Sequence, residues 1–562
     1  MNQALSDNHR NRPEFASSIA SQHEKVADGL GGHYDVIVCG AGSSGSVIAG
    51  RLAANPDVRV LLLEAGGSDE LELVMDPNLW VRAIGSELHW DFVAASNSQL
   101  NGRAIPYSMG KVLGGGSSVN VATWSRGHQA DWDMYAAETD DPAWGYKAVL
   151  DLYRHRIEHW KGSADPLYRG SGGPMRVQPA PDLHPFFGAL LEATEASGIK
   201  RFENPNGRMM ESDGGCAVVD ENVEDGRRKS VFRSYAYGRM DQANLTVLTR
   251  ALVTRVVFDK RRAAGVEVLY EGKLHRFEAA LEVIVSLGSI QTPKLLMQSG
   301  VGDQGQLTKF GIPLVQDLPG VGRNLHDHVA LGCLWDATDE PLPSAPRSQA
   351  ASFWKTDPAL DAPNFYAYGL GGPSITPENL TRFKPSSACW SLLVGMRPVS
   401  RGAIHLTGPN ASDPLEIRAN YLADALDLEA LKTGIAQARE IGAAPALRSY
   451  VRREIAPGRL DRADLEQFIR NGLVTFWHQC GTAKMGRDRM SVVDATLKVY
   501  GVEGLRVADA SVLPRVTTGN TMAPCVVIGE RAAAMLQDEH SITTSFSGSA
   551  TGASANPVEL LG

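Results

Sequence analysis

The sequence has few cysteines, and their spacing does not suit a disulfide framework. Only six occur among 562 residues, no two of them form a CxxC pair, and several lie inside apolar runs: Cys39, Cys216, Cys333, Cys389, Cys480 and Cys525. Small secreted proteins that depend on disulfides usually show denser and more regular cysteine patterns. We therefore expect reduced, buried thiols and a cytoplasmic protein.

Long apolar runs and an excess of positive charge are also missing. No apolar run approaches the ~20 residues that a membrane-spanning helix needs, and residues 1–32 lack the apolar core of a secretory signal. The 55 basic residues are outnumbered by 64 acidic ones, so the net charge is −9. A nucleic-acid partner is not expected, because it would need a basic patch. Peripheral membrane contact and the oligomeric state stay open.

The apolar pattern that is present predicts strands and helices alternating near both ends of the chain, around a strand-rich middle. We expect several strands within residues 245–270, with a turn near 261–265, and another buried strand over 281–287. A long helix is expected over 424–441. Residues 336–385 are rich in proline and are expected to form an irregular region over a site. This order indicates an α/β protein with a discontinuous nucleotide-binding domain and an inserted domain.

A glycine-rich turn follows the first apolar strand, in the segment HYDVIVCGAGSSGSVIAG. Gly40, Gly42 and Gly45 form GxGxxG, in which the glycines permit a tight turn, approach of a pyrophosphate and close helix packing, in that order. A second strand over 58–63 ends in Glu64, near the ~20-residue offset of a carboxylate that accepts from a ribose hydroxyl. The pattern predicts a dinucleotide-binding unit. The alternative is an ordinary βαβ unit with a glycine-rich turn, and the unit alone does not separate FAD from NAD.

Three further segments resemble signature motifs of the glucose–methanol–choline (GMC) flavoprotein oxidoreductases. The first is GKVLGGGSSVNVATWSRGHQADWD over 110–133, and the second is GSIQTPKLLMQSGVG over 288–302. The third runs from 476 to 533 and contains FWHQCGTAKMG, GLRVADASVLP and TTGNTMAPCVVIGERAA. PGVGRNLHDH, over 319–328, is similar to a linker of the same family. The resemblance covers most of the chain, from about 34 to 536.

The resemblance implies the GMC fold, an α/β architecture in which a discontinuous Rossmann-like FAD-binding domain carries an inserted α+β substrate domain. The ends of the chain are polar or rich in Ser, Thr, Gly and Ala, and we expect them to be flexible. The expected division is a flexible leader over 1–32, an FAD-binding domain over 33–330 interspersed with parts of the substrate domain, a substrate domain over 331–475, a return to the FAD domain over 476–540, and a disordered tail over 541–562.

The resemblance also implies FAD rather than NAD. The segment LRVAD reads as a second strand ending in Asp509, as in folds where an aspartate reaches the ribityl chain; a helix N-cap before Ala510 is the alternative, and both roles can coexist. Val119 stands where some relatives similar to choline oxidase have a histidine that tethers the flavin, so we expect non-covalent FAD. The residues expected to bind FAD are Gly40, Gly42, Ser43, Ser44, Gly45, Glu64, Ala65, Lys111, Val112, Gly115, Gly116, Ser117, Asn120, Val121, Val253, Trp477, Asp509, Ala510, Asn520, Thr521 and Met522.

The resemblance places the active-site base at His478 and its partner at Asn520. An alcohol that is oxidised loses a hydroxyl proton and a hydride, and a neutral imidazole, with an ordinary pKa near ~6.5, can accept the proton. A carboxamide can donate to the developing alkoxide without competing for that proton. The alternative for His478 is a core histidine bonded to a backbone carbonyl. Its neighbour Trp477 can line a pocket or pack in the core.

Other candidate residues are given weaker roles. His326 and His328 flank Asp327 as metal ligands would, but no further ligand with zinc-like spacing follows, so we expect a structural loop and no metal. Trp90 and Asp91 are expected near the flavin edge through the resemblance. Four aromatic residues of the insert suit a pocket wall and core packing equally: Phe365, Tyr366, Tyr368 and Trp390.

The resemblance implies oxidation of a primary alcohol to an aldehyde by hydride transfer to the flavin, with oxygen as the acceptor. A choline-type or quinone-linked alcohol dehydrogenase is one alternative. An FAD-containing hydroxynitrile lyase is another, and a non-catalytic flavin-binding protein is a third. No cluster of carboxylates in the insert marks a site for a quaternary ammonium group. This favours a primary alcohol on an aromatic or otherwise uncharged small molecule, while choline stays open.

Overall fold

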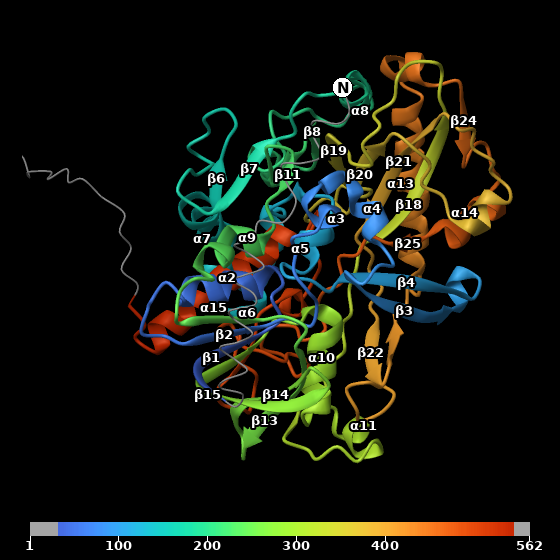
Figure 1. Ribbon diagram of the computed structural model, residues 1–562. Coiled ribbons are helices and arrows are strands. Elements are labelled where there is room, and N and C mark those ends of the chain that lie inside the picture. Colours follow the sequence, from blue (N-terminus) through green and yellow to red (C-terminus); the bar gives the residue numbers. More distant parts are fainter. Residues whose placement is uncertain (1–31, 544–562) are drawn as a thin grey trace, which may run out of the picture.

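The computed structural model describes residues 32–543. The expected leader, except for residue 32, and the expected tail beyond Thr543 lie outside the described residues. Two large β-sheets, each beside its own hydrophobic core, dominate the described chain (Figure 1). All six cysteines belong to this range and are unpaired; five are buried and Cys525 is half-buried. None of the described helices is both long and apolar enough to cross a membrane.

The first sheet has the strand order β12-β2-β1-β15-β14-β13, with β26 beside β15. The strands β12, β2, β1, β15 and β26 pair in parallel, whereas β13, β14 and β15 pair antiparallel. Every residue of β2 is buried, as expected of an apolar strand covered on both faces. The strands are β1 (His33–Cys39), β2 (Val60–Leu63), β12 (Leu245–Leu248), β13 (Leu252–Asp259), β14 (Arg262–Tyr270), β15 (Lys273–Val285) and β26 (Leu505–Val507). These bounds confirm the strands expected near 58–63 and within 245–270, while the strand expected over 281–287 is the end of a longer strand, β15, that finishes at Val285.

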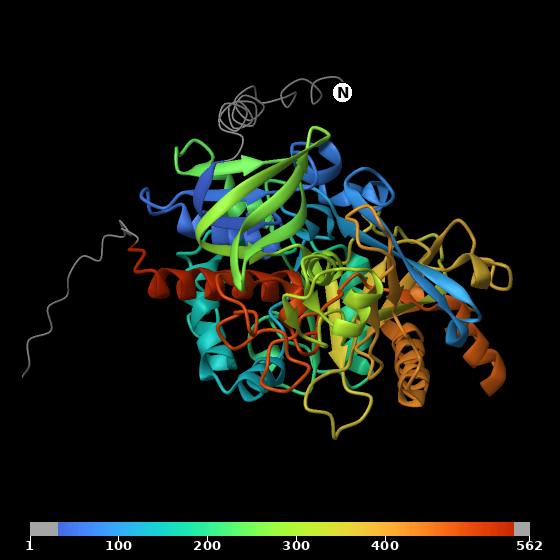
Figure 2. The same cartoon turned by 90° about the horizontal axis from the view of Figure 1, so that it is seen from below.

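Two helices from opposite ends of the sequence pack together on this sheet. These are α2 (Ser43–Leu52), which follows the glycine turn, and α15 (Met522–Glu539) (Figures 1 and 2). The hydroxyl of Ser44 donates to the carbonyl of Cys525 over 2.7 Å, which ties the start of α2 to the start of α15. This contact brings Asn520, just before α15, towards the glycine turn.

The second sheet is antiparallel and has the order β24-β18-β21-β20-β19-β8, with β25 beside β18. Its strands are β8 (Gly215–Val218), β18 (Val329–Asp336), β19 (Ala350–Trp354), β20 (Phe365–Leu370), β21 (Cys389–Met396), β24 (Arg453–Ala456) and β25 (Val474–Thr475). Three helices pack on it: α8 (Pro185–Ala196), α13 (Ala425–Gly442) and α14 (Arg462–Gly472). The α13 helix confirms the one expected over 424–441, and the Asp424 side chain caps it by accepting from the N–H of Leu426.

The irregular region expected over 336–385 is only partly correct. Strands β19 and β20 lie inside it and pair with each other within the second sheet, where every residue of β19 is buried. The prolines of this region lie in the connections rather than in the two strands. The proline content averaged over the whole segment therefore conceals the two strands.

Smaller elements complete the described chain. The hairpin of β3 (His89–Asn97) and β4 (Arg103–Gly110) pairs with β23 (Leu415–Arg418), which pairs with β22 (Ala403–Leu406). The short strands are β5 (Thr123–Trp124), β6 (Glu158–Trp160), β7 (Met175–Pro179), β9 (Asp220–Glu221), β10 (Val223–Glu224), β11 (Arg227–Arg228), β16 (Val301–Gly302) and β17 (Gln316–Asp317). The remaining α-helices are α3 (Glu72–Met75), α4 (Trp80–Ala83), α5 (Gly116–Val119), α6 (Gln129–Thr139), α7 (Tyr146–Leu152), α9 (Val231–Tyr235), α10 (Gly288–Gln298), α11 (Gln304–Lys309) and α12 (Pro377–Leu380).

Candidate active site

A cavity of about 1190 Å³ extends from the glycine turn of the first sheet to the second sheet. Gly40 and Gly42 line it on the side of the first sheet, while Tyr368 of β20 and Leu393 of β21 belong to the second. Pockets for drug-sized ligands usually measure about 300–1,000 Å³. The cavity therefore has room for a large cofactor together with a small substrate.

Two glycine segments meet at the wall of this cavity with no side chain between them. A Cβ atom on Gly115, whose φ is 53°, would lie 2.8 Å from the Cα atom of Gly42. A Cβ atom on Gly45 would overlap the carbonyl oxygen of Gly40, which confirms that this glycine lets α2 pack closely on the turn. The result is a cradle of bare backbone, which suits close approach of phosphates or a flat ring.

The Glu64 carboxylate, directly after β2, is held in place by backbone donors. One oxygen accepts the N–H of Ala41 over 3.1 Å and the other accepts the N–H of Gly66 over 2.8 Å. Burial raises its pKa to about 7, against the opposing effect of these hydrogen bonds. An ionised carboxylate has about four lone-pair sites, so Glu64 can still accept a hydrogen bond from a ligand in the cavity that it lines.

Asp509, two residues after β26, shows the N-cap arrangement. One carboxylate oxygen accepts the N–H of Ser511 over 2.8 Å, and the other accepts from the N–H of Gly288 and the hydroxyl of Thr292, over 2.9 and 2.6 Å. Burial raises the pKa of this carboxyl group. The N-cap interpretation is confirmed, and because Asp509 also lines the cavity, a contact with a cofactor hydroxyl stays a prediction.

Most residues expected to bind FAD come together on the cavity wall. These are Gly40, Gly42, Ser43, Ser44, Glu64, Ala65, Gly115, Gly116, Ser117, Asn120, Val121, Val253, Trp477, Asp509, Ala510, Asn520, Thr521 and Met522. Gly45, Lys111 and Val112 are not part of the wall. Gly45 packs α2 on the turn, Val112 belongs to a small hydrophobic cluster, and the ammonium of Lys111 lies 4.6 Å from the centre of the Trp90 ring. The cradle, the two buried carboxylates and the cavity volume together fit an extended dinucleotide such as FAD.

His478 and Asn520 face each other at this wall. The amide nitrogen of Asn520 lies 3.2 Å from Nε2 of His478, and the amide oxygen accepts the hydroxyl of Tyr368 over 2.6 Å. The Phe476 ring stacks on the imidazole, with centroids 5.3 Å apart and planes 13° from parallel. Trp477 has a backbone φ of 59°, and its N–H donates to the Thr475 hydroxyl over 2.8 Å. Such left-handed backbone in a large residue is strained and concentrates at functional sites.

The ring of His478 has side-chain partners at both nitrogens. Its Nδ1 lies 2.9 Å from Nδ1 of His328 and 3.3 Å from the Tyr366 hydroxyl. This environment differs from the core-histidine alternative, in which a backbone carbonyl would hold the ring. Burial lowers the pKa of His478 to about 3, so the imidazole is neutral at ordinary pH and can act as a proton acceptor.

The His326–His328 segment lies directly behind His478. The ring of His326 contacts the carbonyl of Pro398 and the N–H of Val516, over 2.8 and 3.1 Å, so it has the structural role expected of this loop. Asp327 and His328, in contrast, touch His478 itself. This placement could not be predicted from the sequence, because the two segments are 150 residues apart and neither carries a signal for the other.

The aromatic residues of the insert divide between the pocket and the core. Tyr368 lines the cavity and belongs to the aromatic wall, whereas Tyr366 lies behind the wall, where its hydroxyl reaches Nδ1 of His478. Phe365 stacks on Trp354 and Trp390 stacks on Trp335, with centroids 5.6 and 4.3 Å apart, so these two pack in the core. Trp477 and Trp80 line the cavity and meet edge to face at 6.1 Å. Trp90 and Asp91 line it as well.

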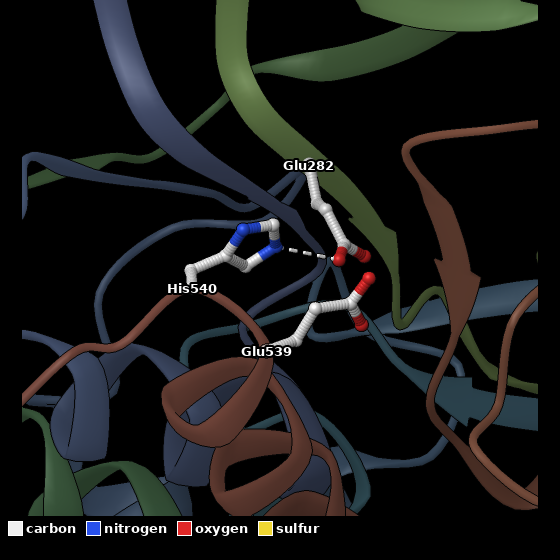
Figure 3. Close-up of side chains that lie close together, drawn as sticks. All are labelled: Glu282, Glu539 and His540. Atoms are coloured by element: carbon white, nitrogen blue, oxygen red, sulfur yellow. Dashed lines mark hydrogen bonds and ion pairs between the residues drawn. The ribbon is translucent and has the colours of Figure 1, made fainter.

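Glu282, Glu539 and His540 form a separate cluster at the end of α15 (Figure 3). Nε2 of His540 lies 2.8 Å from Glu282. The guanidinium of Arg506 pairs with both carboxylates, and Lys498 pairs with Glu539 over 2.6 Å. Because arginine and lysine side chains pair with its carboxylates, this cluster is an ion-pair network that anchors the end of α15.

Comparison with known proteins agrees with this geometry. Two family models, both described as GMC oxidoreductase, match residues 34–330 and 398–529. An "Oxygen-dependent choline dehydrogenase" of Escherichia coli is 35% identical over 92% of this chain and 96% of its own length. An "Alcohol dehydrogenase [acceptor]" of Pseudomonas putida is 34% identical over 90% of this chain and 95% of its own.

A solved structure is similar over nearly its whole length. Pyridoxine 4-oxidase from Mesorbium loti superposes with a TM-score of 0.85 at 30% identity, covering 90% of this chain and 99% of that one. The segments matched by the two family models, 34–330 and 398–529, contain both the glycine cradle and the His478–Asn520 pair. The chain therefore belongs to the GMC oxidoreductase family, as an FAD-dependent enzyme that acts on CH–OH groups.

Proposed function

We propose that this enzyme oxidises the primary alcohol group of an aromatic or otherwise uncharged small molecule to an aldehyde, with His478 as the base and oxygen as the electron acceptor. The observation that carries the proposal is the pairing of a neutral imidazole and a carboxamide, 3.2 Å apart, on the wall of the cavity that also holds the glycine cradle. Bound FAD supplies the hydride acceptor.

His478 takes the hydroxyl proton at Nε2. Its burial keeps the imidazole unprotonated, and the stacked Phe476 ring fixes the orientation of the imidazole plane. Asn520 donates from its amide nitrogen towards the developing alkoxide, while the Tyr368 hydroxyl holds its amide oxygen. A donor positioned in this way stabilises the transition state by typically about 2.7–4 kcal/mol.

The distribution of charge around the cavity favours an uncharged substrate. Among the described residues, the acidic side chains on the cavity wall are Glu64, Asp91, Asp413 and Asp509. Glu64, Asp413 and Asp509 already accept backbone N–H groups, and Asp91 is exposed. The side chains next to His478 are aromatic instead: Tyr366, Phe476 and Trp477. They suit an aromatic substrate, and through cation–π contact they suit a quaternary ammonium group as well. Choline is the second candidate, because a relative at 35% identity is named a choline dehydrogenase.

Several finer assignments belong to the same proposal. FAD is held without a covalent bond, because Val119 on the cavity wall offers no nucleophile. Residues 33–330 and 476–540 supply the FAD domain, and residues 331–475 supply the substrate domain. Strand β8 lies within 33–330 but belongs to the second sheet, which supports the proposal that parts of the substrate domain are interspersed in that range. The unpaired cysteines support a cytoplasmic location.

A screen of alcohols tests the proposal. Purified holoenzyme is given benzyl alcohol, other uncharged primary alcohols and choline in turn, in air, and the peroxide formed is measured. Faster turnover of the aromatic alcohols supports the proposed substrate class, and a preference for choline contradicts it. Reduced enzyme is then mixed with aerated buffer: reoxidation within seconds supports oxygen as the acceptor, whereas persistence of the reduced flavin indicates a quinone or another carrier. Anaerobic bleaching of the flavin by the alcohol rules out the lyase alternative.

A further inference from the structure

The ring of His328 contacts the proposed base on the side away from Asn520. The two Nδ1 atoms of His328 and His478 are 2.9 Å apart, and the rings meet nearly at right angles, at 85°. His328 is only 1% exposed, and its Nε2 has no hydrogen-bond partner among the described residues. A contact of this kind between two buried imidazoles needs one proton between them.

The position of that proton follows from the opposite side of the His478 ring. Nε2 of His478 faces the amide nitrogen of Asn520, which can only donate, so Nε2 must carry a lone pair. The same lone pair is required if His478 is to accept a proton from an alcohol. In a neutral imidazole the proton then resides on Nδ1, and it points at Nδ1 of His328.

We propose that His328 is a positioning residue that holds His478 in the Nδ1–H tautomer by accepting its hydrogen bond, and that the pair shares the proton taken from the substrate. This inference rests on the proposed role of His478 as the base. His328 then carries its own proton on Nε2 and is neutral. Burial and the neighbouring imidazole both lower the pKa of His328, in agreement with the neutral form.

Tyr366 is the competing partner of the Nδ1 proton. Its hydroxyl is 3.3 Å from Nδ1 of His478, whereas Nδ1 of His328 is at 2.9 Å. The shorter distance is typical of an N–H hydrogen bond, and 3.3 Å lies beyond the usual range. The Tyr366 ring meets the His328 ring edge to face at 5.0 Å, so it supports the orientation of His328.

Hydrogen bonds hold the chain segments that carry His328 and His478 side by side. The N–H of Phe476 donates to the carbonyl of His328 over 2.9 Å, and His326 and Cys480 exchange hydrogen bonds of 3.0 and 2.8 Å. The N–H of His478 donates to Asp327 over 2.8 Å. The pairing of the two chain segments therefore fixes the position of one ring relative to the other. A fixed position keeps the hydrogen bond between the two Nδ1 atoms, and this favours a single tautomer of His478.

The arrangement also accounts for where the substrate proton goes. The O–H bond of the alcohol breaks, its electron pair stays on oxygen, and a new N–H bond forms at Nε2 of His478. Bound FAD would supply the oxidant that accepts the hydride of the carbinol carbon, so that loss of the proton and the hydride together converts the alcohol to the aldehyde. The positive charge on the His478 ring can pass to His328 by transfer of the Nδ1 proton, so one charge is spread over two buried rings.

The tautomer can be measured without a substrate. In holoenzyme labelled with [15N]histidine, long-range 1H–15N spectra at neutral pH distinguish protonated from unprotonated ring nitrogens. Spectra of the His328→Gln and His478→Gln variants assign the two residues. We expect a protonated Nδ1 in His478 and an unprotonated Nδ1 in His328. A proton on Nε2 of His478, or on Nδ1 of His328, overturns the inference.

Kinetics give an independent test, with benzyl alcohol or choline as the probe, whichever the wild-type enzyme oxidises faster. His328→Leu should lower kcat on the order of tenfold to a hundredfold while KM changes by less than about threefold, because the base loses its tautomer and the substrate pocket is kept. His328→Asn should recover most of the loss, since its carbonyl oxygen can accept the Nδ1 proton. Thermal unfolding and the flavin content of each variant check folding.

Three outcomes distinguish a failure of this inference from a failure of the proposed function. In the first outcome, Tyr366→Phe lowers kcat on the order of tenfold to a hundredfold and His328→Leu leaves kcat unchanged. Tyr366 is then the partner of the Nδ1 proton of His478, and the inference is wrong. If His478→Ala retains wild-type turnover, the proposed base itself is wrong, whatever His328 does. A loss in His478→Ala together with wild-type kinetics in His328→Leu contradicts only the inference.

Discussion

The carboxylate of Asp327 holds the backbone of His478 in place by accepting its N–H over 2.8 Å. The other carboxylate oxygen accepts from the hydroxyls of Tyr421 and Thr475, over 2.5 and 2.6 Å, and from the side-chain amide of Gln479 over 3.1 Å. One buried acid thus connects the loop before β18 to the segment that carries the proposed base. Burial raises the pKa of Asp327 to about 6, so at neutral pH the group is an acceptor for all four donors.

Replacing Asp327 with asparagine tests this connection. Asn turns one acceptor into an NH₂ group that faces donors, and we expect the free energy of unfolding to fall by about 2–4 kcal/mol, together with a loss of kcat. Asp357→Asn is the matched control, because Asp357 is exposed and should change stability by less than about 0.5 kcal/mol. Chemical denaturation of both variants measures the difference, and equal stabilities would mean that Asp327 does not support the site.

Gly45→Ala should weaken FAD binding through steric overlap. A Cβ atom at this position overlaps the carbonyl oxygen of Gly40, so α2 must move away from the glycine turn. We expect a loss of stability of about 1–3 kcal/mol and a lower flavin content after purification. Gly67→Ala is the control, because nothing lies within 4 Å of a Cβ atom there. The ratio of flavin to protein absorbance reports the result, and full flavin occupancy in Gly45→Ala contradicts the prediction.

The flavin should leave the protein when the protein is denatured. Val119 lines the cavity in the first signature motif and cannot form a bond to the cofactor. Precipitation with acid should therefore release the yellow chromophore into the supernatant. Colour that stays with the precipitate would show a covalent link through another residue.

Protonation of His478 should not limit activity in the mildly acidic range. The base form of His478 is the unprotonated one, and burial lowers its pKa to about 3, so His478 itself should not lower kcat/KM above about pH 5. Asp327, which holds the His478 backbone and has a pKa of about 6, is the group expected to titrate in that range. In Asp327→Asn, whose side chain does not titrate, kcat/KM should therefore stay level from about pH 8 to about pH 5. A midpoint near pH ~6.5, the ordinary value for a histidine, that persists in Asp327→Asn contradicts the predicted environment of His478.

Stability should change with pH in a related way. In the unfolded chain His478 binds a proton near pH ~6.5, but in the native chain it does so only near its lowered pKa of about 3. The unfolded state therefore binds more protons between these values. His478 alone should therefore lower the free energy of unfolding as the pH drops through this window, whereas the raised pKa values of Glu64 and Asp327, about 7 and about 6, act in the opposite direction. Denaturant unfolding of the wild type and of His478→Phe at several pH values isolates the contribution of His478: the stability of the wild type relative to the variant should fall as the pH drops.

The local elements could be predicted from the sequence because their signals are local. The GxGxxG turn, the apolar run of β2 and the capped helix α13 each depend on residues close together in the chain. The turn expected near 261–265 lies slightly earlier, because the tight connection between β13 and β14 is residues 260–261 and residues 262–265 belong to β14. Strands β19 and β20 were missed because they are short and are separated by proline-containing loops, and only their pairing within the second sheet distinguishes them.

The site could be predicted only as far as family motifs reach. His478, Asn520 and the glycine segments lie in recognisable motifs, and the structure brings them to one cavity. Asp327 and His328 looked like a structural loop, because their contacts with His478 depend on the pairing of segments about 150 residues apart. Lys111 and Val112 lie in a signature motif but not on the cavity wall, since motif membership does not say which way a side chain points.

The central claim is that His478 removes the hydroxyl proton and that Asn520 assists. Anaerobic stopped-flow measurement of flavin reduction by the best alcohol tests it directly in the wild type, His478→Ala and Asn520→Ala. We expect the rate, measured on flavin-loaded enzyme, to fall on the order of a thousandfold or more in His478→Ala and about a hundredfold in Asn520→Ala. Flavin reduction at the wild-type rate in His478→Ala would contradict the account.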